Sequence, residues 1–535
     1  MFGKRSTLFR NTVNAIGAGL LIGLTACGGA YYSAQEAPRV ETASMEYAAP
    51  MPTASPSLAA GGTSIPNDEP YDLMFFESAG VNPFVDTEDD HLSTFAMDVD
   101  TASYTVARRY LTDGNMPPPE AIRVEEFINY FDMRYPGPAE GEGAFAIHLE
   151  GAPSRFGPQN AYLLKVDLQG KEILADERKD AVLTFVIDVS GSMNRENRLG
   201  LVKRALRLLV NELRPTDDVG LVVYGSWAQV ILNPTSAEDS ETILAAIDRL
   251  QPDGSTNAEE GLRLAYQTAA QAYRPGAINR VILLSDGVAN VGRTGPDSIL
   301  QVIRDQVAQG ITLSTVGVGM GNYNDVLMEQ LADNGNGNYA YVDTLDEAQR
   351  IFVENLTGTL QVIAKDAKIQ VDFNPEVVRS YRLLGYENRA VADQDFRNDR
   401  VDAGEVGAGH SVTALYEIKF HEAVPLTETD NTALLVQIRY QDVETGQVVE
   451  VAEPFAYRDF AVDFNQTSPE FRFIAAVAEY AEILRESYWA QDSSLKDVET
   501  LALSVMPALA NNNDVSDFMQ LLYRAVQITV DEQGS

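Results

Sequence analysis

The stretch Phe185-Val186-Ile187-Asp188-Val189-Ser190-Gly191-Ser192-Met193 holds the pattern on which both the fold and the site depend. Residues 182–187 form a continuous apolar run, which is typical of a strand buried on both faces of a parallel sheet. The run ends in Asp188, and the hydroxyl side chains of Ser190 and Ser192 follow at alternate positions. Because open parallel sheets bind ligands at the carboxyl ends of their strands, we expect a binding site here.

Strand and helix patterns alternate on both sides of this stretch. Apolar residues recur at helical spacing directly after it, at positions 199, 202, 206, 209, 210 and 213. Further strands are predicted at 219–224, 280–284 and 313–318, with an antiparallel edge strand at 229–232, and helices at 237–250, 258–273, 297–309, 325–333 and 345–357. This alternation predicts an α/β domain over residues 179–360, with a doubly wound parallel sheet of Rossmann-like type.

Two more oxygen donors are expected at the same edge of the sheet. Thr256 lies in Asp253-Gly254-Ser255-Thr256-Asn257, before a predicted helix, and Asp286 follows a predicted strand in Leu284-Ser285-Asp286-Gly287. Hard oxygen donors of this kind suit Mg²⁺, which takes octahedral geometry at ~2.0–2.1 Å, and Mn²⁺ or Ca²⁺ could substitute. Since only two of the donors are charged, a bound metal would still attract a carboxylate from another molecule.

The order of these three elements resembles that in von Willebrand factor type A (VWA) domains of the integrin type. On this resemblance, Asp188, Ser190, Ser192, Thr256 and Asp286 occupy all five positions of the metal-ion-dependent adhesion site, known as MIDAS. The resemblance implies a Mg-type metal and a protein partner that presents an Asp or Glu to it.

The amino terminus predicts export and lipid attachment. Lys4, Arg5 and Arg10 precede an apolar stretch at 13–26, which runs into Leu24-Thr25-Ala26-Cys27 around the single cysteine of the chain. About 14 apolar residues fall short of the ~20 that span a bilayer, so the pattern indicates a signal peptide over residues 1–26. The end of this stretch resembles a bacterial lipobox, which implies a lipid attached to Cys27.

The residue after the cysteine bears on the destination of the protein. Gly28 stands where an inner-membrane retention signal would place Asp. We therefore expect a protein of the bacterial cell envelope that is anchored in the outer membrane. Residues 27–66 are rich in Ala, Ser, Pro, Thr and Gly, and they predict a lipidated flexible tether.

The remaining sequence predicts three flanking regions. An α+β region is expected at 67–150, a β-rich domain with period-two patterning at 365–463, and a helical segment at 464–535. Parts of these flanks, among them Tyr381-Arg382-Leu383-Leu384-Gly385-Tyr386, resemble those of a bacterial lipoprotein family with a central VWA domain. On this resemblance, residues 67–150 are the VWA-associated region of that family, and its C-terminal domain has no assigned function.

The charge and the motifs narrow the classes of function. A formal net charge of −38 argues against nucleic-acid binding, because phosphates need clustered Lys and Arg. Asp98-Val99-Asp100 echoes a phosphatase motif, but Ala102 stands at its fifth position, and capping carboxylates at a strand end are the better account.

The histidine positions argue against an enzyme. None of the four histidines lies within 179–360, so no imidazole is at hand to activate Ser190 or Ser192. We therefore expect a binding protein and no enzyme. Two alternatives stay open: a scaffold whose metal site holds its own domains together, and a hydrolase.

Overall fold

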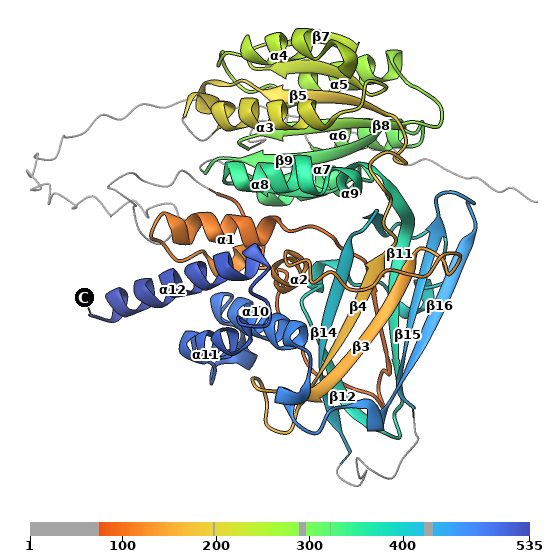
Figure 1. Ribbon diagram of the computed structural model, residues 1–535, viewed down its shortest axis with the longest axis vertical. Coiled ribbons are helices and arrows are strands. Elements are labelled where there is room, and N and C mark those ends of the chain that lie inside the picture. Colours follow the sequence, from red (N-terminus) through yellow and green to blue (C-terminus); the bar gives the residue numbers. More distant parts are fainter. Residues whose placement is uncertain (1–73, 196–197, 288–295, 321–322, 422–431, 535) are drawn as a thin grey trace, which may run out of the picture. The chain divides into compact units, whose positions relative to one another are not determined.

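The computed structural model describes residues 74–195, 198–287, 296–320, 323–421 and 432–534 (Figure 1). The expected signal peptide, the lipid-attachment residue Cys27 and the tether lie outside the described residues. None of the described helices is long and apolar enough to cross a membrane.

A six-stranded sheet forms the α/β domain, in the order β10-β9-β8-β5-β6-β7. Its strands are β5 (Ala181–Asp188), β6 (Asp218–Tyr224), β7 (Ala228–Ser236), β8 (Ile278–Ser285), β9 (Thr312–Val318) and β10 (Tyr339–Val342). Neighbouring strands are parallel except β6 and β7, which are antiparallel. The doubly wound α/β fold and its antiparallel edge strand are confirmed.

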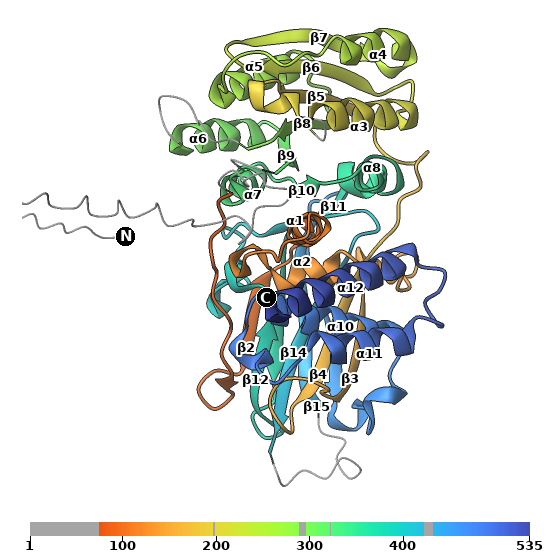
Figure 2. The ribbon, with the colours of Figure 1, turned by 90° about the vertical axis from the view of Figure 1, so that its left-hand side faces the viewer.

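Helices cover both faces of this sheet because β5 sends its side chains alternately to two cores. Phe185 and Ile187 pack into one core, and Val186 packs into the other. Figure 2 shows one layer of helices on each side of the strands. The first layer contains α3 (Leu199–Glu212), α4 (Ser240–Asp248) and α8 (Leu345–Gln349), and the second contains α5 (Ala258–Gln271), α6 (Pro296–Val307) and α7 (Asp325–Asp333).

The helix predicted at 345–357 is interrupted. The chain forms α8, then a π-helical turn at Arg350–Glu354, then α9 (Leu356–Leu360). A π-turn inserts one extra residue into the helical spacing, which a search for apolar period does not resolve, and such turns are frequent at functional sites.

Two antiparallel sheets form a β-sandwich outside the α/β domain. The first has the order β1-β12-β14-β4-β3, and the second has the order β13-β11-β15-β16, with β2 also paired to β11. The strands are β1 (Val85–Asp86), β2 (Leu92–Ala96), β3 (Phe145–Pro153), β4 (Tyr162–Gly170), β11 (Val362–Phe373), β12 (Val378–Leu384), β13 (Gly404–Gly407), β14 (Ser411–Phe420), β15 (Thr432–Asp442) and β16 (Val448–Ala456). One hydrophobic core joins the two sheets.

The sequence predicts that residues 67–150 and residues 365–463 form separate regions, but strands from both ranges build the same sandwich. Strands from both ranges share each sheet: β2 pairs with β11, and β1 pairs with β12. The separation was wrong because period-two patterning identifies a strand but not its partner, and these partners are more than 200 residues apart in the sequence.

Five helices pack together beside the first sheet of the sandwich (Figure 1). They are α1 (Ala102–Thr112), α2 (Val124–Asn129), α10 (Pro469–Leu484), α11 (Leu495–Val505) and α12 (Asn513–Gly534). Their shared core also takes in Leu163 of β4 and Leu415 of β14. The helical carboxyl-terminal segment therefore covers the outer face of that sheet.

A buried ion-pair network fastens α10 to the first sheet. Nε of Arg382 donates to Glu417 at 2.8 Å, and Nη2 of Arg382 donates to Glu482 of α10 at 3.2 Å. The side chains of Arg382 and Glu417 are 0% exposed, and that of Glu482 is 1% exposed. Removing one member of such a network leaves the others charged without a partner in the core, which costs far more than loss of an exposed pair.

We expect Arg382→Ala to lower the free energy of unfolding by about 3–5 kcal/mol, because Glu417 and Glu482 would be left uncompensated. The measurement is urea unfolding followed by the fluorescence of Trp489, whose ring lies 5.4 Å from the Arg382 guanidinium, in a Trp227→Phe background. The control is Arg263→Ala, which removes an exposed helical pair with Glu259 worth about 0.3–0.5 kcal/mol. Equal shifts of the urea midpoint in both variants would contradict the expected effect.

Candidate metal centre

Asp188 is the last residue of β5, and its carboxylate is held from two strands. Its Oδ1 accepts a hydrogen bond from the Ser190 backbone N–H at 2.8 Å. Its Oδ2 accepts one from Ser285 Oγ at 3.0 Å, and Ser285 is the last residue of β8. The residue is fully buried. The carboxylate is therefore fixed where two parallel strands end side by side.

The two serine hydroxyls of the DxSxS pattern lie together beside this carboxylate. Ser190 Oγ and Ser192 Oγ are 2.9 Å apart, with Ser190 buried and Ser192 exposed. The backbone N–H of Gly191 between them donates to the Gly254 carbonyl at 3.0 Å. The hydroxyls thus form a pair at the solvent boundary, and the loop that carries them is tied to the loop of Thr256.

The loop that carries Thr256 is held in place by backbone contacts. The Asp253 N–H donates to the Val189 carbonyl at 2.5 Å, and the Ser255 N–H donates to Ser226 Oγ at 3.2 Å. Asn257 then caps α5 by accepting a hydrogen bond from the Glu260 N–H. Thr256 is half-buried directly before this helix. The structure thus fixes its loop against the DxSxS loop, as the sequence predicts.

Asp286, the fifth predicted residue, is buried and ion-paired with Arg198. The same guanidinium donates to the carbonyl oxygens of Ser192, at 3.2 Å, and of Met320. Gly319 makes room for it, since a Cβ at that position would lie 2.5 Å from Arg198 Cγ. Arg198 therefore connects the DxSxS loop, the end of β8 and the segment after β9.

Arg198 is a residue of the site that the sequence does not predict. An arginine just before an amphipathic helix is usually exposed, and no motif or spacing marks this one as buried. Its side chain is only 2% exposed. By holding one oxygen of Asp286, Arg198 orients that carboxylate and leaves its other oxygen available to a metal ion.

Two buried carboxylates lie close together in this site. Burial, followed by the charge of Asp286, raises the pKa of Asp188 to about 6, although hydrogen bonds from Ser190 and Ser285 act in the opposite direction. A nearby cation would favour the charged form of Asp188 and offset its repulsion from Asp286. The donor set of two carboxylates and neutral hydroxyls fits a hard divalent ion such as Mg²⁺.

The described residues contain no cluster of three or more His, Cys, Asp or Glu side chains that could hold a metal. The candidate metal centre differs from such clusters because hydroxyls make up most of its donors.

The second acidic motif of the sequence has a structural role: Asp98 and Asp100 pair with Arg389 at 2.9 and 3.4 Å, and Asp100 also accepts a hydrogen bond from the Tyr339 N–H. These carboxylates join the α/β domain to the sandwich, whereas the sequence suggested that they cap a strand end.

Three protein families match the chain. The von Willebrand factor type A domain family matches residues 183–354, and a family described as von Willebrand factor matches residues 71–164. The family described as the C-terminal part of uncharacterized protein YfbK matches residues 358–528. The chain therefore contains a VWA domain between a VWA-associated amino-terminal region and a YfbK-type carboxyl-terminal region.

Known proteins and solved structures are similar to different parts of this chain. A VWA protein structure from Catenulispora acidiphila has a TM-score of 0.42 and 15% identity, over 73% of this chain and 91% of that one. A structure of proximal thread matrix protein 1 from the mussel byssus, described with a zinc-occupied MIDAS motif, has a TM-score of 0.28 and 23% identity, over 36% of this chain and 46% of that one. Human inter-alpha-trypsin inhibitor heavy chain H4 is 31% identical over 162 residues, 29% of this chain and 17% of that protein.

One relative is similar over most of its length. Uncharacterized protein YfbK of Escherichia coli (strain K12) is 38% identical over 473 residues, which are 84% of this chain and 80% of that protein. The shared length takes in more than the VWA domain, since the family matches extend on both sides of it. The chain therefore belongs to the family of protein YfbK, with a von Willebrand factor type A domain at its centre.

Proposed function

We propose that this protein binds a protein partner at the bacterial cell envelope through a Mg²⁺ ion held by Asp188, Ser190, Ser192, Thr256 and Asp286. The observation that carries the proposal is the pair of hydroxyls, 2.9 Å apart, beside a buried carboxylate at the edge of the sheet. One of these hydroxyls, on Ser192, is exposed, so the site is open to a partner. Mn²⁺ or Ca²⁺ could take the place of Mg²⁺.

Each residue has a distinct part in this proposal. Asp188 supplies charge from a fixed position, and the serine and threonine hydroxyls supply neutral oxygen atoms. Arg198 orients Asp286 and offsets part of its charge. With few anionic donors around it, a bound divalent ion would retain affinity for a carboxylate. The partner would therefore offer an Asp or Glu side chain, and the proposal assigns no reaction to the site.

The charge of the protein limits the kind of partner. The leader carries three positive residues, Lys4, Arg5 and Arg10, and no acidic ones, so its removal changes the formal net charge from −38 to −38 − 3 = −41. Such a surface repels an acidic protein at long range. We therefore expect a partner that is neutral or basic around one projecting carboxylate.

The lipid anchor belongs to the same proposal. Cys27 would receive the lipid, and residues 27–66 would link it to the folded part, with the outer membrane as destination. The support is the basic and apolar leader that ends in Leu24-Thr25-Ala26-Cys27. A scaffold role, in which the metal holds parts of this chain together, is the alternative that the following experiments separate from partner binding.

We expect Asp188→Ala to weaken Mg²⁺ binding by more than about 100-fold, since changing residues behind the ligands already costs 10–100-fold. Isothermal titration with Mg²⁺ measures this loss. Circular dichroism should stay unchanged, because Asp188 lies at a strand end that water can reach once the side chain is removed. Asp248→Ala, an exposed acid at the end of α4, is the matched control and should bind as the unchanged protein does. Cooperative unfolding of the metal-free protein at room temperature would favour the scaffold role.

Capture of a partner from envelope extracts should depend on the metal. EDTA should abolish capture, as should Thr256→Ala, whereas added salt should weaken it only moderately, because screening over ~8 Å hardly affects a coordinated bond. Co-precipitation with the lipid-anchored chain, with and without EDTA, is the measurement. A partner that binds equally well in EDTA and to both Thr256→Ala and Asp188→Ala would place the interface elsewhere.

Replacing Cys27 with Ser should release the protein from membranes or leave the precursor uncut. Processing and lipid attachment both need the cysteine thiol, which serine lacks. Membrane flotation and the apparent mass on gels measure the two outcomes, and sucrose-gradient fractionation of the unchanged protein identifies the membrane. Normal processing with full membrane retention of Cys27→Ser would contradict the anchor.

A further inference from the structure

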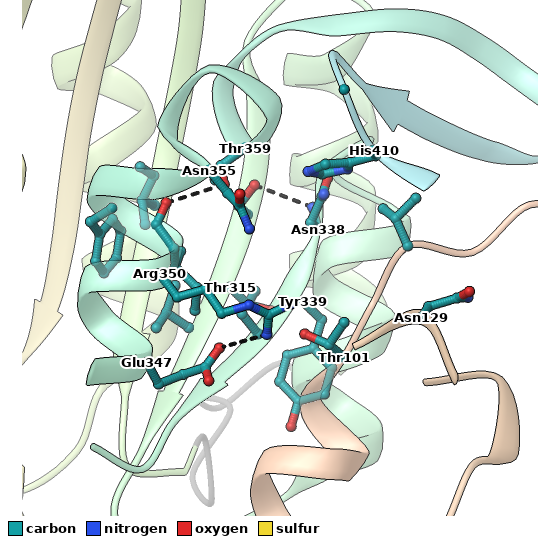
Figure 3. Close-up of a pocket in the computed structure, with 18 of the residues that line it drawn as sticks. Thr101, Asn129, Thr315, Asn338, Tyr339, Glu347, Arg350, Asn355, Thr359 and His410 are labelled. Atoms are coloured by element: carbon teal, nitrogen blue, oxygen red, sulfur yellow. Dashed lines mark hydrogen bonds and ion pairs between the residues drawn. The ribbon is translucent and has the colours of Figure 1, made fainter. Parts of the chain in front are cut away.

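A cavity of about 110 Å³ lies between the α/β domain and the β-sandwich (Figure 3). Residues of β8, β9, β10 and the π-helical turn line it from the α/β domain, and residues around His410 line it from the sandwich. This is a different place from the metal centre: Arg280 in the cavity lies near the amino-terminal end of β8, whereas Asp286 follows the carboxyl end of that strand. The cavity belongs to no part of the proposed adhesion site.

Arg280 places a positive charge in the wall of this cavity. The residue is 1% exposed, and its guanidinium donates only to neutral acceptors: Thr312 Oγ1 at 3.1 Å, Ser314 Oγ at 3.2 Å and the Thr359 carbonyl. Among the ion pairs of the described residues, none includes Arg280. Buried charges in proteins are normally paired, so this one calls for a counter-ion.

The acid that acts on Arg280 from a distance is itself neutral near pH 7. Burial lowers the pKa of Arg280 to about 10, which still leaves it cationic, and the charge of Glu405 opposes that shift. Burial, followed by the charges of Asp402 and Asp366, raises the pKa of Glu405 to about 8. Glu405 is therefore mostly protonated at neutral pH and does not balance the guanidinium.

A second guanidinium and its partners do not remove this excess. Arg350 of the π-helical turn pairs with Glu347 at 3.4 Å, but Glu347 is shared with Arg108 at 2.8 Å. Arg108 also pairs with Asp343. Asp514 also acts on Arg350, but among charged groups only Glu405 contributes to the pKa shift of Arg280, so these acids do not serve Arg280 as a counter-charge. Asp132, the other acidic residue of the lining, is exposed.

His410 adds an unused hydrogen-bonding group. Its Nδ1 is buried without a partner, and its ring is held against Gly358, where a Cβ would lie 2.7 Å from Nε2. Burial, followed by the charges of Arg350 and Arg280, lowers the pKa of His410 to about 4, so the imidazole is neutral near pH 7. Figure 3 shows His410 beside Asn338 on one side of the cavity, with Arg350 and Glu347 on another.

We propose that this cavity binds a small oxyanion, which pairs with Arg280 and accepts hydrogen bonds from His410 and Asn338. The volume of about 110 Å³ has room for a small oxyanion such as phosphate, sulfate or a small carboxylate. The anion contacts both the α/β domain and the sandwich, so it joins them.

Isothermal titration of the full chain with inorganic phosphate, sulfate and acetate tests the site. Each of these salts is substituted for chloride at constant ionic strength. Saturable binding of at least one oxyanion is expected, together with a rise in Tm that grows with its concentration. Arg280→Gln should weaken binding at least about tenfold, since a charge-assisted pair is lost. Asn338→Ala, which leaves the arginine in place, should weaken it less. Arg263→Gln, an exposed arginine of α5, is the control and should bind normally.

Two results would overturn the proposal. One is the absence of heat and of any Tm change with all three oxyanions, which would mean that the cavity holds water alone. The other is binding that survives unchanged in Arg280→Gln and in Asn338→Ala. If Arg280→Gln does not fold, Arg280→Lys keeps the charge but loses the planar fork, and the proposal then requires weakened binding in that variant and in Asn338→Ala.

Discussion

Burial of β5 between β6 and β8 is the constraint on which the rest of the structure depends. All eight residues of β5 are buried, and both neighbouring strands run parallel to it. Parallel strands bring their carboxyl ends to one edge, so Asp188 and Ser285 meet there and Asp286 follows directly. The donors of the candidate metal centre are thus positioned by the core of the domain, and the loops add only the hydroxyls.

The α/β domain is inserted into the chain of the sandwich. β4 ends at Gly170 and β11 begins at Val362, so the domain lies between two strands that belong to different sheets. Ion pairs from α1 and from the residue before α2 also reach it: Arg108 contacts Asp343 at 2.6 Å, and Arg123 contacts Asp325 at 2.7 Å. The amino- and carboxyl-terminal regions therefore form one body that holds the VWA domain by buried contacts, with the cavity lined by Arg280 in the same interface.

Local patterns explain which parts of this arrangement could be predicted from the sequence. The apolar run at 182–187 predicts β5, and the motif positions of Ser190, Ser192 and Asp286 predict their place at its edge. In contrast, β4 was not identified, because Lys165, Asp167 and Gln169 interrupt its apolar pattern although all three are buried. Lys165 pairs with Asp167, and Asp167 accepts from Thr413 of a distant strand at 2.7 Å.

The other features missed from the sequence also depend on distant partners. Arg198 gains its role only when Asp286 and Met320 fold around it, and Arg280 is notable only because none of the described carboxylates forms an ion pair with it. Pairing of the amino-terminal strands with β11 and β14 is likewise set by packing, which sequence spacing does not encode.

The central claim is that the hydroxyl pair and the two carboxylates at the edge of the VWA sheet hold a divalent ion. The most direct measurement is a crystal structure of the protein grown with Mn²⁺ and recorded at a wavelength where manganese scatters anomalously. The account predicts one strong anomalous peak within about 2.0–2.3 Å of Ser190 Oγ and Ser192 Oγ, a distance typical of oxygen ligands of such ions. A saturated crystal with no peak at this edge, or with the manganese bound elsewhere, would contradict it.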